Sequence, residues 1–226
     1  SPDSPDRDRL VLSKGHASAA LYAVLAEKGY IDKEELKTFR NIDSNLQGHP
    51  DMNKVPGVDM TTGSLGQGLS VANGMALSSK LDSRGYRVYC ILGDGELQEG
   101  QIWEGMMYAA GKGVDNLIAT VDYNGKQIDG PTDKVLPLGD LKAKFEAFGW
   151  SVVTIEKGND IAAILEGLKV AKALTGKGKP VCILLHTKMG HGVDFMMGTH
   201  AWHGKAPNDE QLAKALAQNP ETLGDY

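Results

Sequence analysis

The sequence predicts an α/β protein in which a mainly parallel sheet lies between two layers of helices (a three-layer α/β/α fold). From residue 86 onward, short apolar runs alternate with longer segments of helical pattern, and this alternation is typical of a parallel sheet with helices on both faces. The runs at 86–92 and 117–121 are the pattern expected of strands that are covered on both faces. Right-handed crossovers then bring the carboxyl ends of the strands to one edge of the sheet, where ligands bind in such folds.

The N-terminal part is less regular than the rest of the chain. Residues 9–12 predict a short strand, and the Ala- and Leu-rich residues 17–29 predict a helix that a glycine ends. Residues 32–39 predict a second short helix with Asp32 as its N-cap. Prolines, glycines and asparagines between 40 and 63 indicate a long irregular loop, and a loop of that length in a compact domain is often functional.

The remaining elements follow from the same patterns. A glycine-rich turn at 61–68 opens a helix of small and apolar residues, and the free backbone N–H groups of such a turn suit an anion. Strands are expected at 86–92, 117–121, 151–155 and 181–185. Helices are expected at 69–81, 98–112, 140–148, 161–174 and, on the surface, 208–218.

Length and composition limit the possible functions. The chain has 226 residues, with 24 Lys and Arg against 29 Asp and Glu, so its formal charge is −5. The length allows one good-sized domain, and the mildly acidic balance gives no support to nucleic-acid binding. The 28 glycines cluster at turns beside apolar runs, which indicates close approach of the backbone to a ligand.

The location of the protein is inferred by default. No apolar run approaches the roughly 20 residues of a membrane span, and we find no signal-peptide pattern. Cys90 and Cys182 lie inside apolar runs, where buried reduced thiols are expected. A cytoplasmic protein is therefore expected. Because the chain opens SPDSPDRDR, without Met or an apolar element, we also expect that an N-terminal segment is missing.

Oxygen-bearing side chains follow two of the predicted strands. Asp94 lies between Gly93 and Gly95 directly after one strand, and Asn124 follows the next. One carboxylate, one amide oxygen and a backbone carbonyl form a sparse oxygen site that suits Mg²⁺, because this ion takes few protein ligands and completes its shell with phosphate oxygens and water. The alternative is that Asp94 and Asn124 are ordinary turn residues, for which both types are favoured.

The segment GDGELQEGQIWE, followed by VDYN, resembles the thiamine-diphosphate motif of transketolases. The likeness extends to DRDRLVLSKGHASAALYAVL, QGHP, TTGSLGQGLSVANGMAL and GTHAWHGKAP, and together these segments cover most of residues 7–207 in the order of that family. The resemblance implies that residues 1–226 are the diphosphate-binding domain of a transketolase or the N-terminal subunit of a split one. It also implies thiamine diphosphate and Mg²⁺ as cofactors, with Ca²⁺ or Mn²⁺ as possible substitutes for the metal.

The resemblance implies roles for particular residues. The side chains of Asp94 and Asn124, with the carbonyl of Lys126, would bind the metal, and the N–H group of Gly95 would bind a diphosphate oxygen. Ile128 and Met189 match positions that pack on the thiazolium ring, although ordinary core packing explains them equally well. The full set of expected cofactor contacts is His16, Gly63, Ser64, Leu65, Gly95, Asn124, Ile128, Met189 and His203.

Three histidines are the expected catalytic residues. A histidine in a loop is most often a solvated residue, but the resemblance places His16 and His203 at the diphosphate and the reacting substrate, and His49 at the substrate hydroxyls. Ketol transfer requires protons to move to and from hydroxyl and carbonyl oxygens near neutral pH, and imidazole serves both directions. The glycines of 189–206 indicate a lid that settles when cofactor binds.

The resemblance further implies a partner chain. In this family a glutamate from a pyrimidine-binding domain, usually that of the neighbouring protomer, activates the cofactor. Nothing after Ala206 is long enough to form that domain, so the expected partner is a transketolase C-terminal subunit, in a heterotetramer built on a homodimer. Glu99 matches an acidic residue at the contact between cofactor-binding domains, and its alternative is the acidic start of a helix.

The expected reaction is transfer of a two-carbon ketol unit from a ketose phosphate to an aldose phosphate, as in the pentose phosphate pathway. Two alternatives remain open. The chain could serve another thiamine-diphosphate enzyme, of the deoxyxylulose-phosphate synthase or 2-oxoacid dehydrogenase type, although LQEGQ and the histidines argue against it. It could also be a non-catalytic assembly module that keeps the cofactor motif.

Overall fold

A parallel sheet forms the centre of the molecule. The computed structural model describes residues 1–219, and residues 220–226 of the expected domain lie outside the described part. Every neighbouring pair of strands in the main sheet is parallel. In spatial order the strands are β1 (Arg9–Leu12), β2 (Val88–Gly93), β3 (Leu117–Tyr123), β7 (Val181–His186) and β6 (Ser151–Ile155).

The register brings the carboxyl ends of the central strands to one edge of the sheet. Gly93 at the end of β2 pairs with Asp122 of β3, and Tyr123 pairs with His186 of β7. Segments that are far apart in the sequence therefore leave the sheet side by side, as the crossover rule requires.

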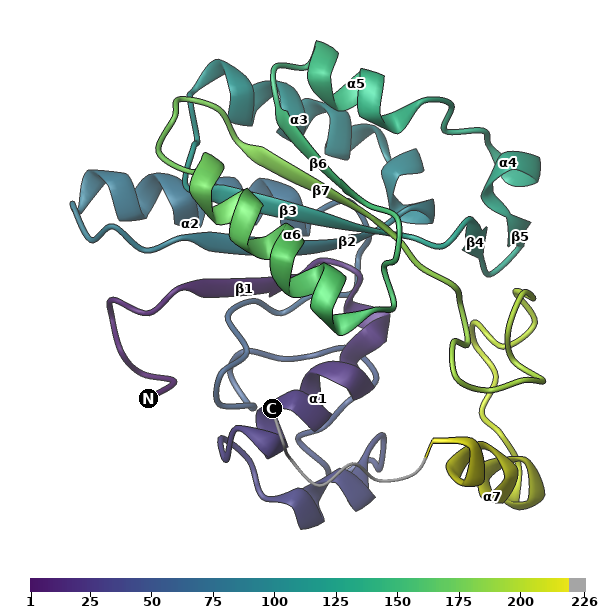
Figure 1. Ribbon diagram of the computed structural model, residues 1–226. Helices are drawn as coiled ribbons and strands as arrows, with labels where there is room; N and C mark the ends of the chain where they lie inside the picture. Colours follow the sequence, from purple (N-terminus) through teal and green to yellow (C-terminus); the bar gives the residue numbers. More distant parts are fainter. Residues whose placement is uncertain (220–226) are drawn as a thin grey trace.

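Three helices cover one face of the sheet (Figure 1). They are α2 (Gly68–Leu81), α3 (Gly100–Gly111) and α5 (Leu141–Ala147). Their apolar side chains, among them Leu69, Ile102 and Phe145, form one buried cluster with Val88 and Cys90 of β2. Burial of such side chains is the main stabilising contribution in a domain of this size.

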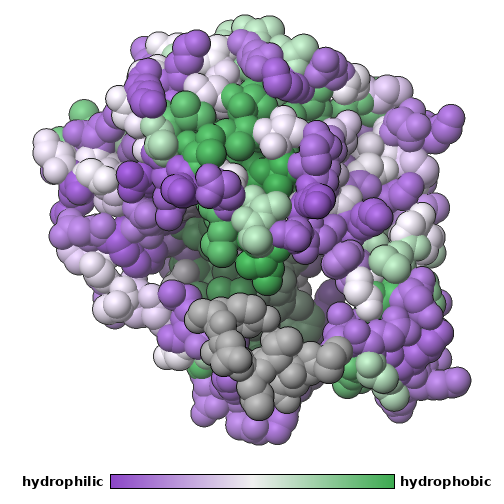
Figure 2. Space-filling model, viewed as in Figure 1, coloured by the Kyte–Doolittle hydropathy of each residue, from purple (hydrophilic) through white to green (hydrophobic). Residues whose placement is uncertain are grey.

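The opposite face is covered by α6 (Ile161–Leu174), which buries Ala171 against Ile118 and Ile183 of the sheet. Helices therefore lie on both sides of a parallel sheet, and the predicted three-layer fold is confirmed. Coverage of this face is incomplete, because Tyr89 and Ile91 of β2 are only half-buried. Figure 2 shows a patch of hydrophobic residues that runs from the upper part of this face down to its centre. The expectation that residues 86–92 are covered on both faces thus holds only in part.

The irregular loop at 40–63 builds a small core of its own with α1 (Ser18–Glu27). Tyr22 of α1 is buried against Leu46 and Val58, and its hydroxyl donates to the backbone oxygen of Gln47 at 2.9 Å. The loop is therefore packed onto the helix that follows the Ser13–His16 turn.

Some local elements differ from the prediction. Residues Lys33–Thr38 form a 3₁₀ helix, although Asp32 caps it as expected by accepting from the N–H group of Glu34. Residues Gly95–Gln98 also form a 3₁₀ turn, so α3 begins at Gly100 and not at 98. Three short elements were not predicted: β4 (Lys126–Gln127), β5 (Gly130–Pro131) and α4 (Thr132–Val135).

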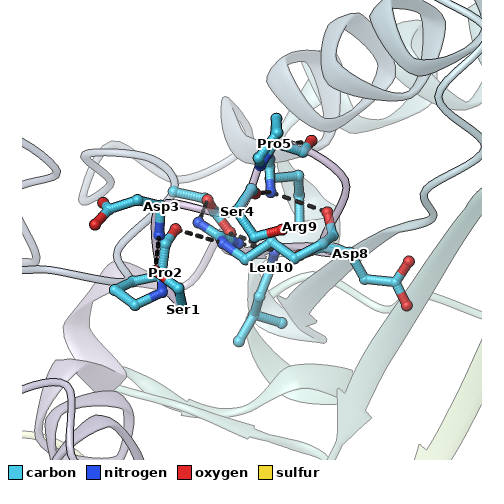
Figure 3. A network of polar contacts seen from close by, with 10 residues as sticks. Ser1, Pro2, Asp3, Ser4, Pro5, Asp8, Arg9 and Leu10 are labelled. Atoms are coloured by element: carbon cyan, nitrogen blue, oxygen red, sulfur yellow. Dashed lines mark hydrogen bonds and ion pairs between the residues drawn. The ribbon is translucent and has the colours of Figure 1, made fainter.

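The two ends of the described chain are held by polar contacts. In the N-terminal arm, shown in Figure 3, the guanidinium of Arg9 donates to the backbone oxygens of Ser4 and Pro5. Arg7 binds both carboxylate oxygens of Asp59, at 2.8 and 2.5 Å. At the other end, α7 (Asp209–Gln218) begins with a capping box. Among residues 1–219, no helix combines the length and the apolar character needed to cross a membrane.

Candidate cofactor site at the strand ends

Two adjoining cavities lie at the edge of the sheet where the strands end. One has a volume of about 250 Å³ and is lined by the Asp94 turn, Leu65 and residues 126–129. The other has a volume of about 760 Å³ and lies between α1, the half-buried face of the sheet and the segment after β7. Four residues line both cavities: Lys14, His16, Asn124 and His203. Three of these four were predicted site residues.

The Asp94 turn is held by its own side chain. Asp94 is 1 % exposed, and its two carboxylate oxygens accept from the N–H groups of Gly95 at 2.7 Å and Gly125 at 2.5 Å. Asn124 Oδ1 accepts from the N–H group of Lys126 at 2.9 Å. The ends of β2 and β3 are thereby joined, and the three expected metal ligands lie in one small region.

This donor set fits a hard cation. Burial raises the pKa of Asp94 to about 6, against the two backbone hydrogen bonds that lower it, so a cation beside the carboxylate would offset a desolvation penalty. A Cβ on Gly95 would lie 2.9 Å from Oε1 of Gln127, so a larger residue here would require the side chain of Gln127 to move. Within the described residues no cluster of three or more His, Cys, Asp or Glu could hold a metal, so a metal here would depend on amide and carbonyl oxygens as well.

The backbone of the Ser13–His16 turn comes close to the backbone of the glycine-rich turn at 61–68. A Cβ on Gly15 would lie 2.7 Å from the nitrogen of Gly63, so these two segments meet only because residue 15 is glycine. A Cβ on Gly63 would lie 3.1 Å from Cγ of His49. His16, Gly63 and His49 are therefore brought together from three separate segments.

The imidazoles of His16 and His203 lie with their ring centroids 5.1 Å apart. Desolvation of the ring, followed by the nearby His203, Lys14 and His49, lowers the pKa of His16 to about 4. Desolvation and Lys14 lower the pKa of His203 as well. Both rings are therefore neutral at neutral pH, with one nitrogen able to accept a proton.

The other predicted residues are more dispersed. Leu65 and Ile128 line the smaller cavity, and Ile128 is 64 % exposed. Met189 lines the larger cavity. Ser64 is exposed and, like Gly63 and His49, lies outside the lining of both cavities.

One polar network was missed by the sequence reasoning. Lys14, just after β1, forms an ion pair with Asp122 of β3, and the hydroxyl of Thr187, after β7, donates to the same carboxylate. This network ties three strand ends together beside the larger cavity, and Lys14 lines the smaller cavity as well. The available signal was a polar residue close to the end of each strand, which is the same signal that identified Asp94 and Asn124.

The fold and this site define a thiamine-diphosphate-binding domain of the transketolase family. The family model described as "Transketolase, thiamine diphosphate binding domain" matches residues 1–221, and the chain belongs to this family. The predicted family is confirmed, because a match of this extent covers nearly the whole chain.

The relatives include separately encoded subunits. The "6-deoxy-6-sulfo-D-fructose transketolase subunit SqwG" of Clostridium sp. (strain MSTE9) is 48 % identical over 217 residues, covering 96 % of this chain and 78 % of that protein. An apulose-4-phosphate transketolase subunit from Phocaeicola vulgatus is 40 % identical over 225 residues, covering 98 % of this chain and 79 % of that protein. The chain thus corresponds to a transketolase N-terminal subunit.

Solved structures agree with this assignment. The transketolase from Leishmania mexicana superposes with a TM-score of 0.90 at 34 % identity, covering 96 % of this chain and 34 % of that one. The chain therefore spans about a third of the length of a single-chain transketolase.

Proposed function

We propose that this chain is the diphosphate-binding subunit of a two-chain transketolase. With a partner that carries the pyrimidine-binding domain, it transfers a two-carbon ketol unit from a ketose phosphate to an aldose phosphate. One observation supports this most directly: His16 and His203 lie beside the Asp94–Asn124 turn at the junction of two cavities. Metal ligands and proton-transfer groups therefore border the same space, in a chain whose relatives are named transketolase subunits.

In this proposal residues of the smaller cavity would hold the diphosphate and the metal. Thiamine diphosphate, when bound, supplies the nucleophilic carbon that carries the two-carbon unit. Asp94, Asn124 and the carbonyl of Lys126 would hold Mg²⁺, or Ca²⁺ or Mn²⁺ in its place. The N–H group of Gly95, which donates to Asp94 Oδ1 in this structure, would donate to a diphosphate oxygen.

The ring systems of the cofactor would be contacted by apolar side chains and backbone. Gly63, Ser64 and Leu65 would border the aminopyrimidine, and Ile128 and Met189, which line the two different cavities, would pack on the thiazolium.

The histidines move protons at the substrate oxygens. His16 and His203 are neutral at neutral pH because desolvation lowers both pKa values, so each can accept a proton from a hydroxyl group and return it to a carbonyl oxygen. His49, close to Gly63, is placed on the substrate hydroxyls.

The partner completes the site. A glutamate of the pyrimidine-binding domain acts on the aminopyrimidine ring, and two copies of each chain form a heterotetramer, with Glu99 at the contact between cofactor-binding domains. Residues 1–226 form one diphosphate-binding domain in this arrangement. We place the assembly in the cytoplasm and its reaction in the pentose phosphate pathway.

The test is a coupled ketol-transfer assay with the purified chain alone and with its partner. Fructose 6-phosphate and 6-deoxy-6-sulfo-D-fructose are both offered as donors, because the latter sugar is named in a relative. Activity is expected only with both chains present. Cofactor binding without turnover by any cognate pair would instead indicate an assembly module, and pyruvate consumption would indicate another thiamine-diphosphate enzyme.

Asp94→Ala should abolish Mg²⁺-dependent binding of thiamine diphosphate, because it removes the only carboxylate of the proposed metal site. Calorimetric titration of the two-chain assembly measures the effect, and Asp133→Ala, an exposed carboxylate of α4, is the control. Unchanged affinity in Asp94→Ala would contradict the metal site.

A further inference from the structure

Glu96 is a buried carboxylate that the proposed reaction does not use. It is 2 % exposed and both of its oxygens are occupied. Oε1 accepts from the hydroxyl of Ser13 at 2.5 Å and from the N–H group of Gly66 at 2.9 Å. Oε2 accepts from the N–H group of Gly93 at 3.1 Å. One side chain therefore satisfies three donors.

The three donors belong to three different segments of the site. Ser13 directly follows β1 and stands three residues before His16. Gly66 is adjacent to Leu65 in the glycine-rich turn, and Gly93 is adjacent to Asp94. The segment after β1, the glycine-rich turn and the end of β2 are thus all bound to the same carboxylate.

No cationic side chain among residues 1–219 forms an ion pair with Glu96. A buried carboxylate without a positive partner is destabilising unless hydrogen bonds satisfy it. Here neutral donors alone satisfy it, and they do so from positions 83, 30 and 3 residues away in the sequence. Glu96 also lies in the 3₁₀ turn Gly95–Gln98, and α3 begins only after this turn, at Gly100.

We propose that Glu96 is a positioning residue, which holds the β1 end, the glycine-rich turn and the Asp94 turn at the spacing that the cofactor requires. This inference rests on the proposed function. Glu96 contributes through hydrogen-bond acceptance by both oxygens, and the segments it joins carry the groups that contact cofactor and metal.

Glu96→Gln tests this property with almost no change in volume. The amide offers one acceptor oxygen and one NH₂ donor. If its oxygen faces Ser13 and Gly66, the NH₂ group faces the N–H group of Gly93 and leaves that donor unsatisfied. An unsatisfied buried donor weakens the site by roughly 10-fold or more in affinity, with the loss centred on the Asp94 turn.

The first readout needs no cofactor. In the full chain, hydrogen–deuterium exchange of peptides that contain Gly66 and Gly93 should be faster in Glu96→Gln than in wild type. Two variants serve as controls. Ile102→Val in the core of α3 loosens the fold generally, and Glu166→Gln makes the same chemical change on the exposed surface of α6.

The second readout is the affinity of the two-chain assembly for thiamine diphosphate with Mg²⁺. We expect its Kd and the KM for cofactor to rise about 10-fold in Glu96→Gln, while kcat at saturating cofactor changes little. Ser13→Ala should have a smaller effect and should add little in the Glu96→Gln background, because both changes break one network.

Each outcome decides between the two proposals. Wild-type assembly that does not bind thiamine diphosphate would overturn the proposed function. Wild-type binding that Glu96→Gln leaves unchanged would overturn the positioning role alone. A third outcome would also overturn the inference by assigning Glu96 a purely structural role. In it, Ile102→Val, compared at equal free energy of unfolding, shows the same faster exchange as Glu96→Gln, and the KM for cofactor does not rise selectively in Glu96→Gln.

Discussion

The ammonium group of Lys14 affects several other groups of the site. It is held by Asp122, whose other oxygen accepts from Thr187, and it lines the same cavities as His16 and His203. Its charge adds to desolvation in lowering the pKa of both imidazoles, because a nearby cation disfavours a second positive charge.

Lys14→Met should therefore raise the pKa of His16 and of His203, although desolvation will still keep both below the usual histidine value. An NMR titration of the imidazole carbons measures this directly. Lys33→Met, which removes an exposed lysine paired with Glu27, is the control and should leave both titrations unchanged. Identical titrations in Lys14→Met and wild type would show that Lys14 does not act on these rings.

At the scale of elements, two turns of the site approach each other closely because one of them carries a glycine at the contact. Gly15 lies in the 3₁₀ turn before α1, and its missing Cβ is what lets the turn meet the backbone of Thr62 and Gly63. Backbone atoms cannot yield as the end of a flexible side chain can, so the fit at this position is strict.

Gly15→Ala should destabilise the chain by about 1–3 kcal/mol through overpacking and should weaken cofactor binding by separating His16 from the glycine-rich turn. Gly111→Ala is the matched control, because a Cβ there meets nothing within 4 Å and alanine favours the helix. Denaturant unfolding curves measure both. Equal stability of Gly15→Ala and wild type would mean that the two turns can move apart freely.

For the whole molecule, His16 and Asp94 change the free energy of unfolding in opposite directions as pH falls. His16 titrates near 4 in the folded chain against 6.5 in the unfolded chain. The unfolded chain therefore binds this proton first, and stability falls as pH drops from about 6.5 to about 4. Asp94 titrates near 6 in the folded chain against 3.8 in the unfolded chain, so its contribution to stability rises as pH drops from about 6 to 3.8.

Single substitutions should separate these contributions in the chain free of cofactor and metal. His16→Asn should make the loss of stability in acid smaller, and Asp94→Asn should make it larger. Thermal unfolding between about pH 4 and pH 7 measures both slopes. Slopes that change in the same direction in the two variants would contradict the assigned pKa shifts.

The sequence was sufficient for the sheet because each strand carries its own apolar run, and for the Asp94–Asn124 pair because each residue directly follows a strand. It was not sufficient for the 3₁₀ turn at Gly95–Gln98, whose Glu96 contacts residues up to 83 positions away. The pairing of Lys14 with Asp122, 108 positions apart, likewise depends on strand order. Local patterns predict elements, whereas such contacts exist only after the strands have been placed.

The segment at 187–208, between β7 and α7, carries both Met189 and His203 and runs along the side of the molecule in Figure 1. It is fastened to α7, because Gln218 bonds to the backbone and the carboxylate of Asp194 at 2.8 and 3.0 Å. Fixing a residue in one conformation costs about 1–2 kcal/mol in entropy, and hydrogen bonds such as these offset part of that cost. The position of His203 beside His16, with the ring centroids 5.1 Å apart, is therefore coupled to α7, and a change at the Asp194–Gln218 contact is expected to reach the imidazole from outside the cavities.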